Sequence, residues 1–335
     1  MQEKAMLCAF MRQSLRAFAL AAVILGCLDA SAQTGADQYP ARPITIIVPF
    51  APSGPADIEA RLYTPLLTKQ LGQPMVLDYK TGGGTSIGTG FVAKAAPDGY
   101  TLLTNTAGFA ILPAFYKLPF DIINDLAPIS MMSTKTSILI VPANSQFRTF
   151  TDYLAYARAN PGKINYGTSG AGALGHLTAE WLHADAGAKV TFVHYKGNST
   201  LMADLIAGRV DMGSSSTIAA LQLIKSGKVR ALAVKGPERL KQMPDLPSVS
   251  EYMKGYRDLN WQGFFAPGAT PAPIMNKLST AFRTVAKDPD LAKKMEPLES
   301  DMVGSSPEEF RKQLITEVER WKGLVSRLNI EKPDE

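Results

Sequence analysis

The chain has 335 residues, of which 46% are hydrophobic and 19% are charged, and its formal net charge is +5. This length and composition are typical of a globular protein with two domains that each bury a core. The charge is modest, and no run of Lys and Arg is interleaved with aromatic residues. Nucleic acid is therefore not expected as a partner.

Residues 1–32 are predicted to be a signal peptide. Arg12 and Arg16 precede the apolar run Ala17–Leu28, and Ala30–Ala32 supplies the small residues of a cleavage site. The apolar run is shorter than the roughly 20 residues that cross a bilayer. We therefore expect export to the periplasm.

Two alternatives remain open for this segment. Lipid attachment at Cys27 would anchor the exported chain, and translation from Met11 would give a more typical signal. Cys8 and Cys27 are the two cysteines of the sequence, and both precede the expected cleavage site. The mature chain is therefore expected to have no disulfide, no catalytic thiol and no cysteine metal site.

Strands and helices alternate after a short polar tail. The β-branched run Ile44–Val48 predicts a buried parallel strand, which Pro49, Pro52 and Pro55 end before a helix that reaches Leu71. The following elements are expected to be strands at Met75–Tyr79, Tyr100–Thr104 and Ala127–Met132, a helix near Ser86–Ala96, and a loop with a short helix at Asn105–Tyr116.

A second α/β set begins at Ser137–Val141. Its other elements are expected to be strands at Ile164–Tyr166, Val190–His194, Val210–Gly213 and Val229–Val234, and helices at Phe150–Ala159, Leu174–Ala186, Thr200–Ala207 and Ile218–Lys225. After the proline-rich stretch Pro244–Pro247, we expect a strand at Leu259–Ala266 and helices at Ile274–Ala286, Pro289–Met295 and Pro307–Leu328.

This alternation predicts an α/β fold with two lobes, each a mainly parallel sheet flanked by helices. Residues 39–135 and 253–335 would form lobe 1, and residues 136–252 would form lobe 2. Ligands of open α/β sheets bind beyond the carboxyl ends of the strands, so two facing lobes would enclose a ligand in one cleft.

The loop Phe50–Gly54 is expected to form one half of an anion-binding cleft, because the helix that follows begins with free backbone N–H groups. Ser53 and Asp57 are each candidate N-caps of that helix. The candidate ligand-binding residues of lobe 1 are Phe50, Ala51, Ser53, Gly54, Asn105 and Thr106.

The segment Gly170–Gly175 matches G-x-G-x-x-G between a strand and a helix. A dinucleotide site would also need an acidic residue after the next strand, but that strand ends at His194 and is followed by Tyr and Lys. A smaller anion is favoured, bound by hydroxyl and N–H groups. The candidates here are Thr168, Ser169, Gly170 and Gly172.

Ser215 and Ser216 lie in the hydroxyl-rich run Gly213–Thr217, between a strand and a helix. They are candidates for hydrogen bonds to a carboxylate, and helix capping is the alternative. Trp261 is expected in the core, with lining of the cleft as the alternative.

Ser86 lies in a G-x-S-x-G pattern, which occurs at the nucleophile of serine hydrolases. No histidine pattern places His176, His183 or His194 beside it with a carboxylate behind, so capping of a helix by Ser86 is the simpler interpretation. His176 and His183 are seven residues apart, a spacing unlike that of metal ligands on one helix. We therefore expect no catalytic residue, no metal and no cofactor.

From about Tyr39 to Ile330 the chain resembles the Bug-type substrate-binding receptors of tripartite tricarboxylate transporters. Eight stretches carry the resemblance: Tyr39–Ile44, Val48–Phe50, Leu71–Pro74, Val92–Leu102, Ala159–Lys163, Tyr195–Gly197, Ala231–Val234 and Ala266–Pro271.

The resemblance implies a type II-like, Venus-flytrap periplasmic binding protein that delivers a small carboxylate to a membrane permease and catalyses nothing. In the family, Phe50–Gly54 and Thr168–Gly172 would hold the carboxylate. The sequence differs from the family pattern at Ala51–Asp57, which has fewer glycines, and at Ser214–Ser216, where an acidic residue is lost. That loss argues against a ligand with an ammonium group.

We therefore expect a monomeric periplasmic receptor for a mono- or dicarboxylate, aliphatic or aromatic, with permease subunits as partners. Two alternatives stay open at this point. One is an exported serine hydrolase that uses Ser86, and the other is a carboxylate receptor that signals to a sensor kinase.

Overall fold

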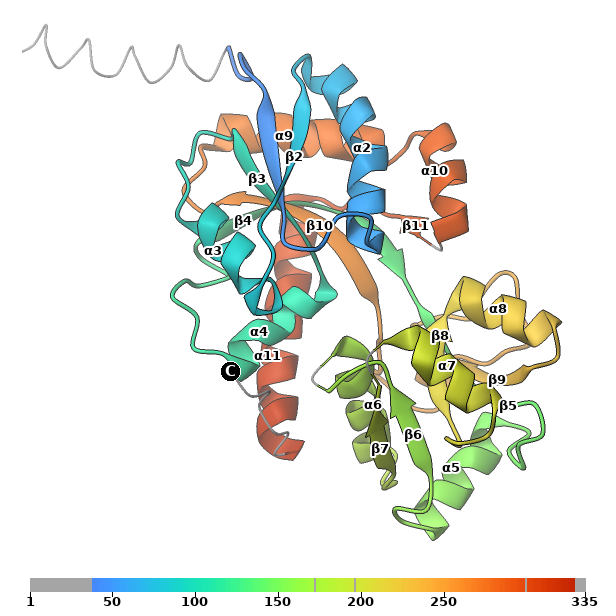
Figure 1. The fold of residues 1–335 in the computed structure, drawn as a ribbon. Coiled ribbons are helices and arrows are strands. Elements are labelled where there is room, and N and C mark those ends of the chain that lie inside the picture. The colour runs from blue at the N-terminus through green and yellow to red at the C-terminus, as the bar shows by residue number, and fades with distance from the viewer. Residues whose placement is uncertain (1–37, 172, 196, 299, 329–335) are drawn as a thin grey trace, which may run out of the picture.

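The structure is a computed structural model that describes residues 38–171, 173–195, 197–298 and 300–328 (Figure 1). The signal peptide expected at residues 1–32 lies outside these ranges. Within them, no helix combines the length and the apolar character needed to cross a membrane.

Six strands form the larger sheet, in the order β11-β4-β10-β3-β1-β2 (Figure 1). They are β1 (Ile44–Val48), β2 (Met75–Tyr79), β3 (Thr101–Thr106), β4 (Leu126–Lys135), β10 (Asn260–Pro267) and β11 (Asp301–Met302). β1 is parallel to β2 and β3, whereas β10 is antiparallel to β3 and β4, and β11 is antiparallel to β4.

The remaining strands form a three-stranded sheet, β8-β5-β9, and a two-stranded sheet, β6-β7. They are β5 (Ser137–Pro142), β6 (Asn165–Thr168), β7 (Thr191–His194), β8 (Gly213–Ser216) and β9 (Val229–Val234). β5 is antiparallel to both of its neighbours, and β6 is parallel to β7.

The α/β class is as expected, but the expectation of mainly parallel sheets is wrong. We call the six strands of the larger sheet the first group of strands, and β5 to β9 the second group. Each group contains both parallel and antiparallel pairs. β4 continues almost directly into β5, and β10 returns alongside β4 from the second group of strands. A strand that returns in this way runs antiparallel to the strand that left, without the helical crossover that parallel pairing requires. The lobe boundaries after residues 135 and 252 stay a prediction.

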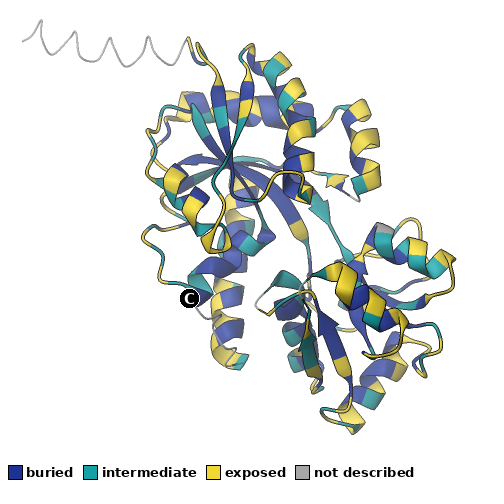
Figure 2. Cartoon of the chain, viewed as in Figure 1, coloured by how far each residue is buried: buried dark blue, intermediate teal, exposed yellow. Residues whose placement is uncertain are grey.

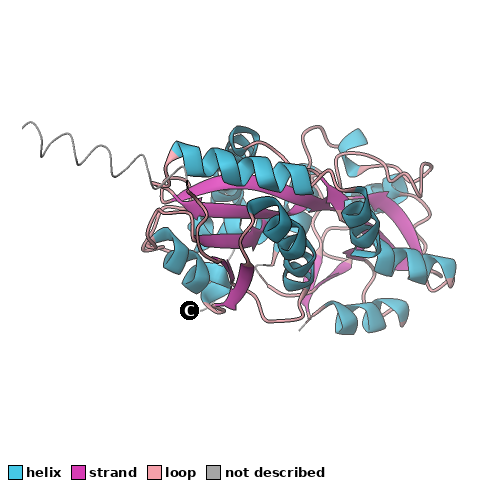
Figure 3. Ribbon diagram, turned by 90° about the horizontal axis from the view of Figure 1, so that it is seen from above, coloured by secondary structure: helices cyan, strands magenta, loops and turns pink. Residues whose placement is uncertain are grey.

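Helices lie on both sides of the larger sheet (Figure 3). The helices are α2 (Pro55–Leu71), α3 (Ser86–Ala93), α4 (Leu112–Phe115), α5 (Phe150–Ala159), α6 (Leu174–Asp185), α7 (Asn198–Ile206), α8 (Thr217–Lys225), α9 (Ala272–Val285), α10 (Pro289–Met295) and α11 (Pro307–Leu328). The predicted strand at Val210–Gly213 is wrong, since β8 begins at Gly213. Val210 and Met212 are buried ahead of it, and Met212 forms an isolated bridge to Tyr166.

The long helix α11 packs against β10 of the larger sheet and against α6 of the second group. Its apolar face, predicted from Phe310 onward at helical spacing, is buried (Figure 2). Near its start Phe310 packs on Trp261, and Trp261 donates a hydrogen bond from Nε1 to Glu317 at 2.8 Å. Near its end Trp321 lies edge-on to Trp181 of α6. Trp261 is therefore a core residue, 1% exposed, as expected.

Candidate functional site

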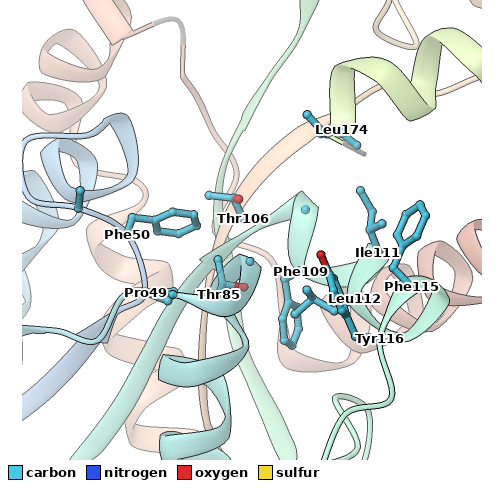
Figure 4. A pocket seen from close by; sticks show the side chains of 15 residues that line it. Pro49, Phe50, Thr85, Thr106, Phe109, Ile111, Leu112, Phe115, Tyr116 and Leu174 are labelled. Atoms are coloured by element: carbon cyan, nitrogen blue, oxygen red, sulfur yellow. The ribbon is translucent and has the colours of Figure 1, made fainter. Parts of the chain in front are cut away.

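A pocket of about 470 Å³ lies where four segments meet: the loop after β1, the turn before α3, residues 106–116, and the start of α6 (Figure 4). It is lined by Pro49, Phe50, Ala51, Gly82, Gly84, Thr85, Thr106, Gly108, Phe109, Ile111, Leu112, Phe115, Tyr116, Ala173 and Leu174. The first three segments connect strands of the larger sheet, whereas α6 connects β6 to β7 of the second group of strands. The pocket is therefore shared between them.

The triple glycine Gly82–Gly84 directs α3 toward this pocket. All three residues have positive φ, and Thr85, the N-cap of α3, has a φ of 87°. Successive left-handed residues are accessible to glycine and costly for residues with a Cβ. This turn leads the chain from β2 into α3, and Gly82, Gly84 and Thr85 lie in the wall of the pocket.

The N-caps of two helices, Thr85 of α3 and Ala173 of α6, both line the pocket. Neither makes a side-chain capping hydrogen bond, and neither helix has an acidic residue in its first turn. By contrast, α5 is capped by Thr149 and α10 by Asp288. The partial positive charge at the N-termini of α3 and α6 is therefore not compensated by the helices' own side chains.

The N-terminus of α2 differs, because it contains its own anion. Asp57 is buried and accepts hydrogen bonds from the Ser53 N–H at 2.7 Å, from Arg61 Nε at 3.0 Å and from the Tyr79 hydroxyl at 2.7 Å. Burial would raise the pKa of this carboxyl group, but the hydrogen bonds from Tyr79, Ser53 and Arg61 outweigh it and lower the pKa.

The predicted N-caps Ser53 and Asp57 are both wrong, since Gly54 occupies that position. Pro55, with its fixed φ, begins the helix directly after Gly54, which places Asp57 inside the first turn. Ser53 and Gly54 do not line the pocket, whereas Phe50 and Ala51 do.

Asn105 is fully buried and does not line the pocket, but it positions groups that do. Its Nδ2 donates to the hydroxyl oxygens of Thr85 at 3.3 Å and Thr89 at 3.2 Å, and its Oδ1 accepts from the Thr106 N–H at 2.9 Å. Because the Thr85 oxygen accepts from Asn105, its proton can be donated to a ligand. The hydroxyls of Thr106 and Tyr116 have no hydrogen-bond partner within the described ranges.

The predicted residues of the loop after β6 lie beside the pocket rather than in its wall. Thr168 is buried, and its hydroxyl bonds to His194 Nδ1 at 2.7 Å. Ser169 is exposed, and Gly170 has a positive φ of 157°. Gly172 lies outside the described residues. Ala173 and Leu174, which follow directly, line the pocket instead.

Ser215 and Ser216 are also absent from the wall of the pocket. Ser215 is buried, and its hydroxyl has no hydrogen-bond partner in the part of the chain that the structure describes. Ser216 is exposed and is the N-cap of α8. The structure thus brings Phe50, Ala51 and Thr106 together from the predicted set, and the other predicted residues that it describes do not line the pocket.

Sequence reasoning missed the residues that make up most of the wall. The triple glycine was a signal that the chain turns sharply at this point, and it could have indicated Thr85. The apolar residues from Phe109 to Tyr116 carried no such signal, since a short run of this kind is equally typical of a core.

Hydrolase chemistry has no support in the geometry. Ser86 is the first residue of α3 rather than its cap. His183 bonds to the Tyr153 hydroxyl and to the Ala179 carbonyl, and His194 bonds to Thr168. Within the described ranges no hydrogen bond joins Ser86 to a histidine, and no group of three or more His, Cys, Asp or Glu could hold a metal.

Comparisons with known proteins identify the family of this chain. The model of the tripartite tricarboxylate transporter family receptors, TctC, matches residues 60–330. A protein of Pseudomonas sp. strain P51, named for its place in the tcbD–tcbE intergenic region, is 37% identical over 86% of this chain and 87% of its own length.

Two solved structures extend the comparison. The periplasmic binding protein BugD is 32% identical, with a TM-score of 0.69 over 88% of this chain and all of its own. A protein from R. palustris, solved with adipate, is 29% identical, with a TM-score of 0.71 over 87% of this chain and 99% of its own. The expected periplasmic-binding-protein fold is thereby confirmed. This chain belongs to the tripartite tricarboxylate transporter receptors of the Bug type, which are periplasmic solute-binding proteins and not enzymes.

Proposed function

We propose that this protein captures a small carboxylate in the pocket and delivers it to the membrane permease of a tripartite tricarboxylate-type transporter. One observation carries the proposal: the N-termini of α3 and α6, which have no side-chain capping hydrogen bond and no acidic residue in the first turn, meet at one pocket. Each terminus would stabilise an anion by about 0.3–1 kcal/mol. The hydroxyls of Thr85 and Thr106 would add charge-assisted hydrogen bonds.

The shared wall of the pocket implies how a ligand would be retained. Ala173 and Leu174 come from α6, and the rest of the lining comes from the larger sheet's group. A ligand that contacts both groups stabilises the arrangement in which both are close, since it binds that state more tightly than an open one. Adipate in the R. palustris relative supports a carboxylate as that ligand. We also propose that residues 1–32 direct the chain to the periplasm and that it acts there as a monomer.

Titration calorimetry on the chain from residue 33 tests the ligand class. The panel pairs each acid with its uncharged amide: adipate with adipamide, hexanoate with hexanamide, and benzoate with benzamide. We expect at least one acid to bind and its amide to bind at least 10-fold more weakly. Binding of a sugar or an amino acid, with no acid binding, would contradict the proposal.

A substitution at Ala173 tests the role of the helix terminus. Ala173→Asp places a carboxylate at the N-cap of α6, which would cap the helix and repel an anionic ligand. Ala173→Asn is the matched control, because it caps equally well without the charge. We expect carboxylate affinity to fall at least 10-fold further in the Asp variant than in the Asn variant. Equal affinities would mean that this terminus does not face the ligand.

A further inference from the structure

We infer that the pocket selects a carboxylate with one ionised group and an apolar body of about the size of a ring, in preference to a dicarboxylate. The inference rests on the proposed function and narrows its ligand class. The observation behind it is the composition of the wall: none of the described residues that line the pocket carries a charge, and their large side chains are mostly apolar. They are Phe50, Phe109, Ile111, Leu112, Phe115 and Leu174.

The wall of the pocket combines a few polar groups with a larger set of apolar side chains. Thr85 and Ala173 mark the two helix N-termini, and Thr106 and Tyr116 each add a hydroxyl. Ile111 and Phe115 lie across the pocket from Leu174 (Figure 4). A ligand with its carboxylate at the helix termini would therefore have its remaining atoms between apolar side chains.

A second carboxylate at that apolar end would be poorly solvated. Among the residues that the structure describes, no Lys or Arg lines the pocket, so an ionised group there would lose water without gaining a cation from them. An apolar ring would instead gain contacts and release water. A volume of about 470 Å³ is within the range of small-molecule sites and leaves room for such a body.

The apolar wall is held in place by the core. Phe109 is fully buried, and its ring lies 5.2 Å from that of Phe265 on β10. Phe115 is 6% exposed, and Leu112 is 4% exposed. Side chains fixed in this way cannot turn aside to admit a hydrated charge without disturbing the packing behind them. The preference for an apolar body should therefore be a property of the folded protein before a ligand binds.

Hexanoate and adipate form a matched pair for the test, because they share a six-carbon chain and differ by one carboxylate. Calorimetry at pH 7.5 is expected to give hexanoate, benzoate or cyclohexanecarboxylate an affinity at least 10-fold above that of adipate and of malate. Adipate binding as tightly as hexanoate would overturn the inference and leave the proposed function intact. Failure of every acid would overturn the proposed function itself.

Two charge-adding variants supply an independent test. Leu174→Arg would place a cation beside the apolar end, and we expect it to change the hexanoate-to-adipate ratio at least 10-fold toward adipate. Leu174→Gln is the control for size and polarity, and it should leave adipate weak. Phe50→Arg, with Phe50→Gln as its control, repeats the test at a half-buried residue of the other wall. Melting curves establish that each variant folds, and an unchanged ratio in both Arg variants would overturn the inference.

Discussion

Asn105 donates a hydrogen bond from Nδ2 to the Thr85 hydroxyl oxygen at 3.3 Å, which joins the end of β3 to the N-cap of α3. The same side chain accepts from the Thr106 N–H. A buried amide thus orients two groups of the pocket wall without lining the pocket itself, and we expect it to act on binding through them. Its contribution to binding is that of a positioning residue.

Asn105→Ala is expected to weaken both folding and binding. It removes a fully buried amide and leaves the Thr106 N–H without its acceptor, at a cost of about 1–3 kcal/mol in the free energy of unfolding. Carboxylate affinity should fall as Thr85 loses its orientation. Urea unfolding and calorimetry measure the two effects. Asn276→Ala, at an exposed residue of α9, should change the free energy of unfolding by less than about 0.5 kcal/mol. Unchanged binding by Asn105→Ala would remove Asn105 from the site.

Lys235 and Asp258 form a buried ion pair between the end of β9 and the start of β10. The Lys235 Nζ lies 2.6 Å from the Asp258 carboxylate and donates to the Thr178 hydroxyl at 2.8 Å. Burial would lower the pKa of Lys235, but the electrostatic interactions with Asp258 and Tyr166 and the hydrogen bond to Asp258 together outweigh burial and raise the pKa. The pair therefore holds the segment between β9 and β10, in which the chain returns to the larger sheet, against α6.

Removal of one partner of this pair should be severe. Asp258→Asn is expected to lower the free energy of unfolding by about 3–5 kcal/mol, because it leaves a buried ammonium without its counter-ion. Lys235→Met combined with Asp258→Leu should cost less than the sum of the single changes, which a double-mutant cycle in urea measures. Lys293→Met, in an exposed pair with Asp290, should cost about 0–1 kcal/mol. Additive single changes at Lys235 and Asp258 would contradict the pairing.

His183 makes stability depend on pH. Burial lowers its pKa from 6.5 to about 4, while its Nδ1 donates to the Ala179 carbonyl at 2.6 Å and its Nε2 accepts from the Tyr153 hydroxyl. Above pH 6.5 the ring is neutral in both states. As the pH falls from 6.5 to 4, the unfolded chain binds a proton that the native ring does not, so stability is lost progressively, by about 3 kcal/mol in total.

Urea unfolding between pH 7.5 and 4 tests this in the wild type and in His183→Gln. The variant should be less stable at pH 7.5, because it loses the packed ring, but its stability should decline less on acidification. The wild type and the variant should therefore converge toward pH 4. Parallel curves would show that His183 does not titrate in this window.

Gly268 has no room for a side chain. A Cβ at this position would lie 2.1 Å from the backbone oxygen of Asn124. Gly268→Ala is expected to lower the free energy of unfolding by about 1–3 kcal/mol, because the obstacle is backbone that cannot rotate away. Gly175→Ala, inside α6 with no atom within 4 Å, should instead stabilise by about 0.5–1 kcal/mol. Urea midpoints that move in the same direction for both variants would contradict this distinction.

Local sequence patterns predicted several elements with their bounds. β1, β2 and β9, together with α5, α10 and α11, begin and end at the expected residues. These elements have strong local signals, such as the Thr149–Asp152 capping box of α5 and the apolar face of α11. Pairing partners have no such signal, and the direction of β10 was therefore missed. The same limit applies to the pocket, where Phe50, Ala51 and Thr106 were found and Thr85 and Phe115 were not.

By itself, the sequence determined three things: the alternation of strands and helices, the family resemblance, and the expectation of an anion site without catalytic residues. Each of them depends on short motifs or on residues that are close together in the chain. Only the tertiary structure decided which helix termini meet at the pocket. Asp57 binds Ser53, Arg61 and Tyr79 and so compensates α2, whereas α3 and α6 contain no such acid. The compensation of α2 depends on contacts between residues up to 22 positions apart in the chain. The pocket depends on two helices that lie far apart in the sequence and meet in the fold. No local sequence pattern encodes either of these.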